Sequence, residues 1–467
     1  PVSQDNFKDY ITPLLYYKRI SDVYDEETEE ALISSGGDKE YASLPEQHRF
    51  VIPDGCHWQE VRERTENFGA AIVGAMRQIE IANPDTLYGV LSMFSSQKWT
   101  NKAILNDSKI RDLIEHLSKR KLGNKDYPAD LMGDAYEILL KKFADDSKAQ
   151  AGEFYTPRSV VRLLVHILDP QPGETVYDPA CGSGGMLIEA IRYMHDDSLC
   201  CGSIFGQEKN VVNAAIAKMN LFLHGASDFN VMQGDTLRDP KILQGGNIAK
   251  FDCVIANPPF SLENWGATEW SSDKYKRNIY GTPSDSCGDY AWIQHMICSM
   301  VSGQGRMAVV MPQGILFRNQ ETEIRKQLVE SDLIEAVVTL GDKLFYGTGL
   351  SPCFLIIRRM KPAHHSGRIL MIDGSKILTQ KRAQNILEEN DIDRLYSLYQ
   401  NYSDEEDYSR IVTLQEIRDK EYNLSPNRYV VYHKEEIRPY AEVLAEFKHA
   451  YEEVKRLEEE FSLLINA

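Results

Sequence analysis

The sequence predicts an α/β protein whose central part folds as a doubly wound, mostly parallel sheet, with helical regions before and after it. Between about residues 153 and 375, apolar segments of strand length alternate with segments whose apolar residues recur every three or four positions. The flanking segments show the helical spacing alone. A chain of 467 residues is also too long for one hydrophobic core. We therefore expect a helical N-terminal domain (1–150), an α/β domain (151–375) and a C-terminal helical region (376–467).

The N-terminal region is interpreted as mostly helical and without catalytic residues. Its apolar side chains at helical spacing are Phe7, Tyr10, Ile11, Leu14, Leu15, Ile104, Ile110, Leu113, Ile114, Tyr136, Leu139 and Leu140. Nothing in the region has the pattern of a catalytic site, so packing or contact with a partner is its expected role.

Seven strands and three intervening helices are predicted in the α/β domain, with ligands expected at the carboxyl ends of the strands. The strand segments are Thr175–Tyr177, Ser203–Gly206, Asn230–Gln233, Phe251–Ala256, Met307–Met311, Ile334–Leu340 and Cys353–Arg358. The helices are Met186–Tyr193, Val211–His224 and Thr322–Val329. A further helix is expected to begin at Thr156-Pro157, with the threonine as N-cap. Only a loop (341–352) joins the last two strands, which predicts an antiparallel pair at one edge of the sheet.

A long amphipathic helix is predicted near the C-terminus. Its apolar stripe consists of Ile437, Tyr440, Leu444, Phe447, Tyr451, Val454, Leu457, Phe461 and Leu464. Such a stripe either packs against a partner helix or folds back on its own domain, and the spacing leaves both open.

The composition is that of a soluble globular protein with a strong negative charge. Hydrophobic residues make up 42% and charged residues 26%, and no apolar run approaches the length of a bilayer. No signal-peptide pattern opens the chain, so we expect a cytoplasmic location without membrane contact. The eight cysteines lack the spacing of a zinc site, so we expect free thiols and no metal. The net charge of −18 opposes unaided binding of nucleic acid, so either the substrate is different or the positive surface is supplied elsewhere.

A glycine-rich turn between a strand and a helix, Asp178–Gly185 (DPACGSGG), is predicted to bind a ligand. Glycines let the backbone approach a ligand closely, and the following helix offers unpaired N–H groups. The turn matches neither G-x-x-x-x-G-K-[ST] nor G-x-G-x-x-G, the spacings of phosphate-binding loops. Asp178 would repel a pyrophosphate, but it suits the amino group of a cationic ligand such as S-adenosylmethionine.

Two further acids end the next two predicted strands. Glu208 can accept hydrogen bonds from both hydroxyl groups of a ribose, and Asp235 can accept one from an adenine amino group. Each acid alone is typical of a solvated loop. Together with Asp178, they place three acids at three successive strand ends that face one crevice, which favours a binding site.

The fourth strand segment leads into Asn257-Pro258-Pro259-Phe260, the predicted catalytic residues. Two successive prolines cannot continue a strand, so the chain must turn into a stiff loop with free carbonyl groups. The amino group of a nucleobase is a poor nucleophile, because its lone pair is delocalised into the ring. The Asn257 side-chain oxygen and the Pro258 carbonyl could each accept one of its N–H groups and return electron density to the nitrogen. Phe260 would stack on the base, which must first be flipped out of a duplex.

Three motifs, Phe154–Pro157 (FYTP), the Asp178 turn and the Asn257 tetrad, occur in this order. The order resembles that of the amino-methylating DNA methyltransferases of the gamma arrangement. A closer resemblance is to the modification subunit of type I restriction–modification systems. The motifs of the closer resemblance are Asp134–Glu137 (DAYE), Gly152–Pro157 (GEFYTP), Gly305–Pro312 (GRMAVVMP), Phe345–Gly349 (FYGTG) and Asn423–Tyr429 (NLSPNRY). The resemblance covers nearly the whole chain. It implies a Rossmann-like S-adenosylmethionine-dependent methyltransferase domain between a helical N-terminal domain and C-terminal helices, acting on N6 of adenine.

The resemblance also implies which residues hold S-adenosylmethionine, with the segment around Thr156 lining its methionine end. The residues expected to bind this cofactor are Phe154, Tyr155, Thr156, Asp178, Ala180, Gly182, Ser183, Gly184, Glu208 and Asp235.

The partners implied are DNA, held through an assembled complex, a specificity subunit that carries the target-recognition domains, and a motor–nuclease restriction subunit. This arrangement would explain the acidic composition. Only Lys274, Lys276 and Arg277, in the polar loop 261–288, are placed to meet phosphates, and a solvated loop explains them equally well. We expect the terminal helix to dock the specificity subunit.

Three rival functions are weighed against this one. A protein glutamine methyltransferase has the same difficulty, because an amide nitrogen is also a poor nucleophile. Phe260 in place of tyrosine and the Tyr155-Thr156-Pro157 segment count against this function. A cytosine N4 methyltransferase usually carries serine where Asn257 stands. A non-catalytic scaffold subunit is disfavoured because the acids and the Asn257 tetrad are intact.

Overall fold

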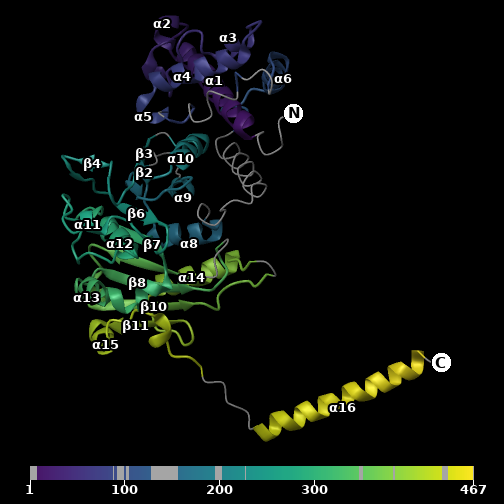
Figure 1. Cartoon of the computed structure of the whole chain (residues 1–467), viewed down its shortest axis with the longest axis vertical. Helices are drawn as coiled ribbons and strands as arrows, with labels where there is room; N and C mark the ends of the chain where they lie inside the picture. Colours follow the sequence, from purple (N-terminus) through teal and green to yellow (C-terminus); the bar gives the residue numbers. More distant parts are fainter. Residues whose placement is uncertain are drawn as a thin grey trace. The chain divides into compact units, whose positions relative to one another are not determined.

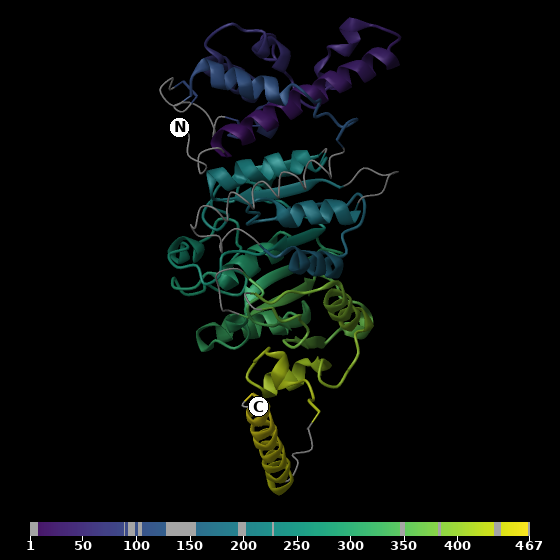
Figure 2. The same cartoon turned by 90° about the vertical axis from the view of Figure 1, so that its right-hand side faces the viewer.

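The computed structural model describes residues 8–87, 89–91, 99–100, 105–127, 156–194, 202–226, 228–345, 351–381, 384–433 and 440–465 (Figures 1 and 2). The chain forms two compact units, residues 1–430 and residues 431–467. None of the helices in the described part of the chain has the length and apolar content needed to cross a membrane.

The larger unit is built on a nine-stranded sheet, with a separate two-stranded sheet formed by β4 (Leu243–Gln244) and β5 (Asn247–Ile248). The nine strands are β1 (Val176–Asp178), β2 (Ile204–Glu208), β3 (Phe229–Gln233), β6 (Cys253–Ala256), β7 (Arg306–Pro312), β8 (Ile334–Leu340), β9 (Pro352–Arg358), β10 (Arg368–Gly374) and β11 (Ser409–Thr413). Their spatial order is β11-β10-β8-β9-β7-β6-β1-β2-β3. Strands β3, β2, β1, β6 and β7 run parallel, as do β8 and β10, whereas β9 and β11 are antiparallel to their neighbours.

The predicted α/β architecture is confirmed, and every predicted strand segment contributes to the sheet. The antiparallel pairing of β8 with β9 is also confirmed, but its predicted position at an edge is wrong. Strand β9 lies between β7 and β8, and two strands that were not predicted, β10 and β11, extend the sheet beyond β8. The sheet therefore continues past residue 375, into the region predicted to be only helical.

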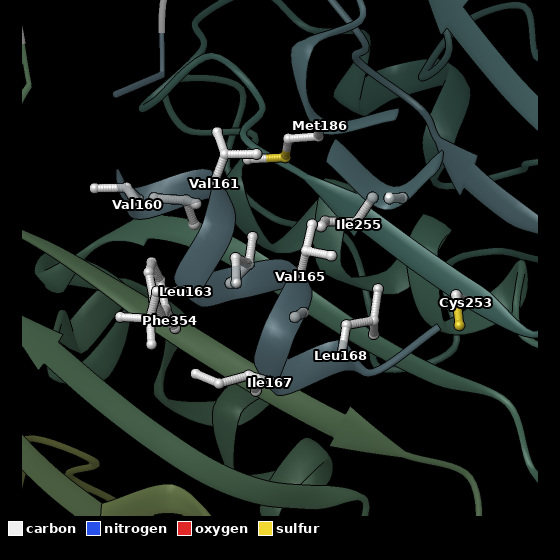
Figure 3. Close-up of a cluster of buried hydrophobic side chains, with 14 of the residues drawn as sticks. Val160, Val161, Leu163, Val165, Ile167, Leu168, Met186, Cys253, Ile255 and Phe354 are labelled. Atoms are coloured by element: carbon white, nitrogen blue, oxygen red, sulfur yellow. The ribbon is translucent and has the colours of Figure 1, made fainter. Parts of the chain in front are cut away.

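Helices cover both faces of the sheet (Figure 1). One face packs against α8 (Arg158–Leu168), α9 (Gly185–Met194) and α14 (Glu389–Asn401), and the other against α12 (Asp289–Cys298), α13 (Thr322–Glu330) and α15 (Leu414–Asp419). In Figure 3, side chains of α8 such as Val165 point toward the strands that carry Ile255 and Phe354. These three side chains are fully buried, and each contributes about 1.5–3 kcal/mol of hydrophobic free energy.

The N-terminal domain packs against α10 (Val211–Leu223). Its described helices are α1 (Lys8–Ser34), α2 (Lys39–Ala42), η2 (Pro45–Gln47), α3 (Trp58–Arg62), α4 (Phe68–Ala82), α5 (Pro84–Leu87) and α6 (Asp107–Leu117). Most residues of α10 from Ala214 to Leu223 are buried, which is typical of a helix that lies between two layers. Leu221 belongs to the core of the sheet, whereas Met219 and Phe222 belong to the core of the N-terminal domain. The Arg49 guanidinium also lies 5.3 Å from the ring centre of Phe222.

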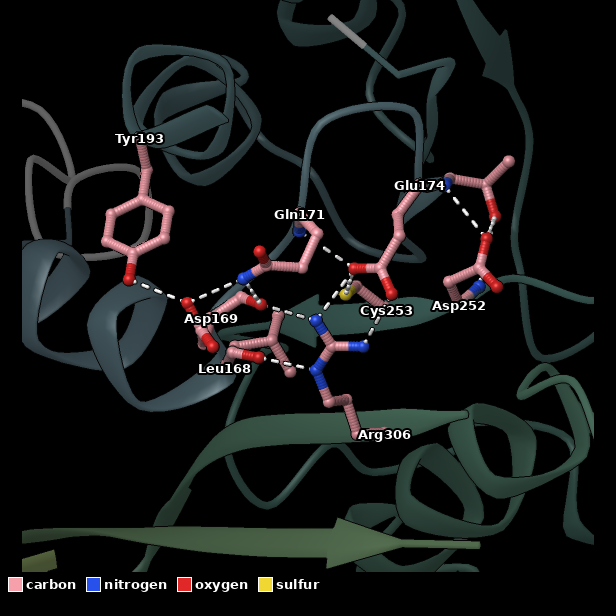
Figure 4. Close-up of polar contacts among 9 residues, drawn as sticks. Leu168, Asp169, Gln171, Glu174, Tyr193, Asp252, Cys253 and Arg306 are labelled. Carbon is pink, nitrogen blue, oxygen red and sulfur yellow. Dashed lines mark hydrogen bonds and ion pairs between the residues drawn. The ribbon is translucent and has the colours of Figure 1, made fainter. Parts of the chain in front are cut away.

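At the amino ends of the central strands, Arg306 joins three segments of the chain (Figure 4). Its guanidinium donates to both carboxylate oxygens of Glu174, at 3.0 and 2.7 Å, and to the carbonyl of Leu168 at 2.6 Å. Next to it, the Asp252 carboxylate accepts the backbone N–H and the hydroxyl of Thr175, at 3.0 and 2.7 Å. These contacts lie at the edge of the sheet opposite the strand ends that carry the predicted site, so they serve stability.

The remaining described helices of the larger unit are short: α11 (Ala267–Trp270), η4 (Gln313–Leu316), η5 (Asn319–Glu321), η6 (Ala363–His365) and η7 (Pro426–Arg428). The smaller unit contains one long helix, α16 (Tyr440–Ile465), as predicted. Seven large apolar side chains on it are exposed: Tyr440, Val443, Phe447, Tyr451, Val454, Leu457 and Phe461.

Candidate active site

The predicted site residues gather at the carboxyl ends of adjacent strands. Strand β1 ends at Asp178, and β6 leads into Asn257. These two strands are parallel neighbours, although they are far apart in the chain. The chain passes from β1 outward to β2 and β3 and then returns to the other side of β1, so the order of the strands reverses between β1 and β6. Open α/β sheets bind their ligands at such a reversal.

The glycine-rich turn is held in shape by its own acids. The Asp178 carboxylate accepts the N–H of Ala180 at 2.9 Å, and the Glu208 carboxylate accepts the N–H of Gly182 at 3.0 Å. Gly182 and Gly184 have φ values of 54° and 85°, which explains why glycine is required at both positions. A side chain at Gly182 would extend into open space rather than into protein, so the backbone of the turn remains accessible.

Burial makes the turn strongly unfavourable for unpaired negative charge. Asp178 is only 2% exposed, and burial, reinforced by the nearby Glu208, raises its pKa from 3.8 to about 8. Burial also raises the pKa of Glu208, although backbone N–H groups that include that of Gly182 oppose the shift. A cationic group beside these two acids would stabilise their charged forms, so the acids and the open glycine turn fit the ammonium group of S-adenosylmethionine.

The third predicted acid, Asp235, follows β3 and is engaged by neighbours. Its Oδ2 lies 2.8 Å from the ammonium group of Lys209, which is largely exposed. The next residue, Thr236, is buried and donates its hydroxyl to the carbonyl of Pro179 at 2.6 Å. The Asp235 turn is thereby tied to the glycine-rich turn, although a ligand that bonds to Asp235 Oδ2 would compete with Lys209.

In the Asn257 loop, the side-chain amide has a defined orientation. Asn257 Nδ2 donates to the Thr156 hydroxyl at 2.8 Å, which directs Oδ1 the other way. That oxygen is buried and has no hydrogen-bond partner within the part of the chain that the structure describes. A buried acceptor without a partner costs free energy, so this oxygen is available for a donor that the chain does not contain.

The prediction that Thr156 caps the next helix is wrong. Helix α8 begins at Arg158, its N-cap is Pro157, and no side chain caps it. The Thr156 hydroxyl bonds instead to Asn257, which lies far away in the sequence. The predicted cofactor residues Phe154 and Tyr155 lie outside the described residues.

The other three residues of the tetrad differ in how far they are exposed. Pro258 is buried, Pro259 is exposed and Phe260 is half-buried. The ring of Phe260 faces that of Phe345, with 6.4 Å between the ring centres and 56° between the planes. Phe345 had no predicted role, although it opens one of the motifs that carry the family resemblance.

One of the three predicted phosphate contacts is wrong. Lys274 and Lys276 are exposed, but Arg277 is 1% exposed and forms an ion pair with Asp273 at 2.8 Å. Its guanidinium also donates to the carbonyls of Thr236 and Leu237, at 2.9 and 2.8 Å. Arg277 therefore supports the turn that follows Asp235 and is not available to DNA.

Asn220 on α10 is another residue of the site that sequence analysis missed. Its side-chain amide donates to the carbonyl of Ser183 in the glycine-rich turn at 2.8 Å. The only signal in the sequence was a polar residue between the apolar residues Met219 and Leu221 of a predicted helix. The partner of that residue could not be read from the sequence.

Comparison with known proteins identifies the family. The sequence profile of the family described as N-6 DNA Methylase matches residues 127–437, and that of the HsdM N-terminal domain matches residues 2–117. The MjaVII methylase subunit, of a type I restriction enzyme from Methanocaldococcus jannaschii, is 35% identical over 471 residues, which cover 96% of this chain and 78% of the relative. The HindI methylase subunit, of a type I restriction enzyme from Haemophilus influenzae, is 31% identical over 360 residues, covering 74% of this chain and 76% of the relative.

A solved structure supports the same assignment. It is the methyltransferase subunit of a type I restriction–modification system from Streptococcus thermophilus, with a TM-score of 0.77 and 26% identity, covering 92% of this chain and 96% of that one. The fold is thus that of the S-adenosylmethionine-dependent methyltransferases. Within that class, the chain belongs to the methylase subunits of type I restriction enzymes, in the N-6 DNA methylase family, and is an adenine-specific DNA methyltransferase.

Proposed function

We propose that the Asn257 loop transfers a methyl group from S-adenosylmethionine to the N6 amino group of an adenine flipped out of DNA. The observation that carries this mechanism is the buried Oδ1 of Asn257, which has no partner among the described residues. An exocyclic amino group is a donor that matches such an acceptor. Because Thr156 holds the other end of the amide, Oδ1 is oriented before the substrate arrives.

The chain's residues would act on the amino group without a general base of shifted pKa. Asn257 Oδ1 and the carbonyl of Pro258 accept its two N–H groups, which localises the lone pair on nitrogen. Fixed dipoles of this kind stabilise the transition state because they need no reorganisation during the reaction. Phe260 packs against the face of the base and holds its plane.

Bound S-adenosylmethionine would supply an electrophilic methyl group on a sulfonium centre. We assign its ammonium group to Asp178, its ribose hydroxyls to Glu208 and its adenine amino group to Asp235, with the segment around Thr156 at its methionine end. The burial of Asp178 supports the first assignment. In the third assignment the adenine amino group would share the Asp235 carboxylate with Lys209, whose ammonium group lies 2.8 Å from Oδ2.

We further propose that DNA is bound through a complex with a specificity subunit, joined by a motor–nuclease subunit for cleavage. The net charge of −18 supports this arrangement, because an acidic chain is repelled by phosphates. The burial of Arg277 supports it further, since it leaves only Lys274 and Lys276 of the three predicted phosphate contacts exposed. The exposed apolar stripe of α16 is the proposed docking surface for the specificity subunit.

A methylation assay tests the proposal. The full-length chain is mixed with labelled S-adenosylmethionine and duplex DNA, with and without the specificity subunit encoded nearby, and the methylated base is identified. We expect N6-methyladenine only when the specificity subunit is present. Label in N4-methylcytosine, or only in a protein acceptor, would contradict the proposal and favour one of the rival functions.

The Asn257→Ala variant tests the mechanism. We expect it to bind S-adenosylmethionine but to transfer methyl groups at least about 100-fold more slowly, as when one oriented dipole is removed from a catalytic site. Asn401→Ala, an exposed asparagine at the end of α14, is the matched control and should retain the wild-type rate. Full activity in Asn257→Ala would refute the proposed role of the amide.

A further inference from the structure

The loop that carries the proposed catalytic residues ends in an unusual conformation. Ser261, directly after Phe260, has φ of 51°, in the left-handed region that residues other than glycine rarely adopt. Its backbone N–H donates to Asp289 Oδ1 at 2.7 Å. The Asp289 side chain therefore stabilises the backbone conformation directly after Phe260, which sets the position of Phe260 in the loop.

Asp289 is held on rigid structure. It is the first residue of α12, is fully buried, and is followed by a helix whose residues are buried as far as Ile297. The segments on either side are also paired, since the N–H of Gly288 donates to the carbonyl of Leu262 at 3.0 Å. Movement of Asp289 relative to the loop would break both hydrogen bonds.

A buried carboxylate needs a counter-ion, and Arg318 supplies it. Arg318 Nη2 lies 2.5 Å from Asp289 Oδ2, and Arg318 Nε lies 2.9 Å from a carboxylate oxygen of Glu321. Arg318 follows β7, the strand beside β6. The two oxygens of Asp289 thus have separate partners, the loop on one side and the segment after β7 on the other.

We propose that Asp289 is a positioning residue for methyl transfer: with Arg318 as its counter-ion, it holds Ser261 and thereby fixes Phe260 against the target base. Asp289 does not touch the reacting atoms in this scheme. The inference rests on the proposed function, because it assumes that the Asn257–Phe260 loop receives the base. A displacement of about 1 Å in a catalytic site can cost about 100-fold in rate, so the effect is measurable.

The experiment measures single-turnover methyl transfer by the full-length chain in its complex with the specificity subunit and duplex DNA. The dissociation constant of S-adenosylmethionine is measured on the same preparations. We expect Asp289→Ala to lower the transfer rate about 100-fold while changing that dissociation constant by less than about twofold. With 2-aminopurine in place of the target adenine, the variant should also change the fluorescence of the flipped base, which reports its stacking.

A paired substitution separates positioning from charge. Asp289→Asn alone places an amide NH₂ group against the Arg318 guanidinium, so it should lower the rate as well. In Asp289→Asn with Arg318→Gln, the new amides can bond to each other while the Asn oxygen accepts the Ser261 N–H. This double variant should recover to within about tenfold of the wild-type rate. Because Asp289→Asn preserves the side-chain volume, it decides the question if the alanine variant does not fold.

The matched control is Glu335→Gln, which neutralises another buried acid that is paired with an arginine, Arg358. Glu335 lies near the amino end of β8, away from the strand ends that carry the site, so its loss should lower stability but leave the transfer rate unchanged. A wild-type rate in Asp289→Ala, or a parallel loss of cofactor binding, would overturn the inference. Absence of adenine methylation by the wild-type complex would instead refute the proposed function.

Discussion

Proton release on cofactor binding is the sharpest prediction of the candidate site. Burial, followed by the repulsion of Glu208, raises the pKa of Asp178 to about 8 in the ligand-free chain, so its carboxyl is mostly protonated at neutral pH. If the ammonium group of S-adenosylmethionine binds beside it, the charged carboxylate becomes favourable and the proton leaves. A carboxyl with a pKa of about 8 is about nine-tenths protonated at pH 7, so nearly one proton should be released per cofactor bound.

The same shift sets the pH dependence of affinity and stability. Below about pH 7 the ligand's own ammonium group stays mostly charged, so affinity should rise about tenfold per pH unit as Asp178 loses its proton more easily. The folded pKa lies above the unfolded value of 3.8. Stability from Asp178 is therefore fully present below about pH 4 and is lost as pH rises toward about 8. The Asp178→Asn variant should lack both dependences and be more stable than the ligand-free wild type at pH 7.

Isothermal titration calorimetry measures the released proton directly. The binding enthalpy is compared between phosphate and Tris buffers, whose ionisation enthalpies differ, at several pH values from 6 to 7.5. Methylthioadenosine, which lacks the amino-acid part of the cofactor, is the control ligand and should release no proton from Asp178. Equal proton release by this control, or proton release that persists in Asp178→Asn, would refute the assignment of the ammonium group to Asp178.

Three further predictions concern the rest of the chain. Thr156→Val should lower methyl transfer roughly fivefold, because a net hydrogen bond of about 1 kcal/mol no longer orients Asn257, whereas Thr156→Ser should stay near the wild type in single-turnover assays. Arg306→Gln should destabilise the fold by about 3 kcal/mol in denaturant titrations, since it leaves Glu174 partly buried without its cation, and the transfer rate of the folded protein should not change. Truncation after Tyr432 should abolish assembly with the specificity subunit in size-exclusion chromatography while cofactor binding persists, and intact assembly would show that α16 is not the docking element.

The strands that are easiest to predict from the sequence are those marked by a run of apolar residues within the strand itself. Strands buried on both faces are continuous apolar runs, and the predicted segments that became β6, β7, β8 and β9 are of this kind, whereas β3 lies at an edge and is mostly exposed. Strand β11 lies at the other edge, begins with Ser409 and Arg410 and has no such run, and it was not predicted. The position of β9 could not be predicted either, because pairing order depends on contacts between distant segments and not on the composition of a strand.

The positions of the candidate site residues at strand ends were also more predictable than the residues that hold them in place. Asp178, Glu208 and Asn257 stand at the ends of strands, with a glycine or proline within two residues of each, and this is a local pattern that the sequence shows. Thr156 and Arg277 have no such signal: a threonine before proline is typical of a helix cap, and an arginine in a polar loop is typical of a phosphate contact. Their true partners, Asn257 and the backbone after Asp235, are set by the order of the strands.

The residues that hold the candidate site in place explain how two distant segments of the chain can form one site. The glycine-rich turn and the Asn257 loop lie on adjacent strands, and both are tied to the 261–298 region that follows the loop. Arg277 in that region holds the turn after Asp235, which Thr236 connects to Pro179 of the glycine-rich turn, and Asp289 holds the end of the Asn257 loop. Arg277, one of the three residues that the sequence placed to meet phosphates, is therefore used to join the two halves of the candidate site. This use of a cation inside an acidic chain strengthens the argument that the positive surface for DNA comes from a partner subunit.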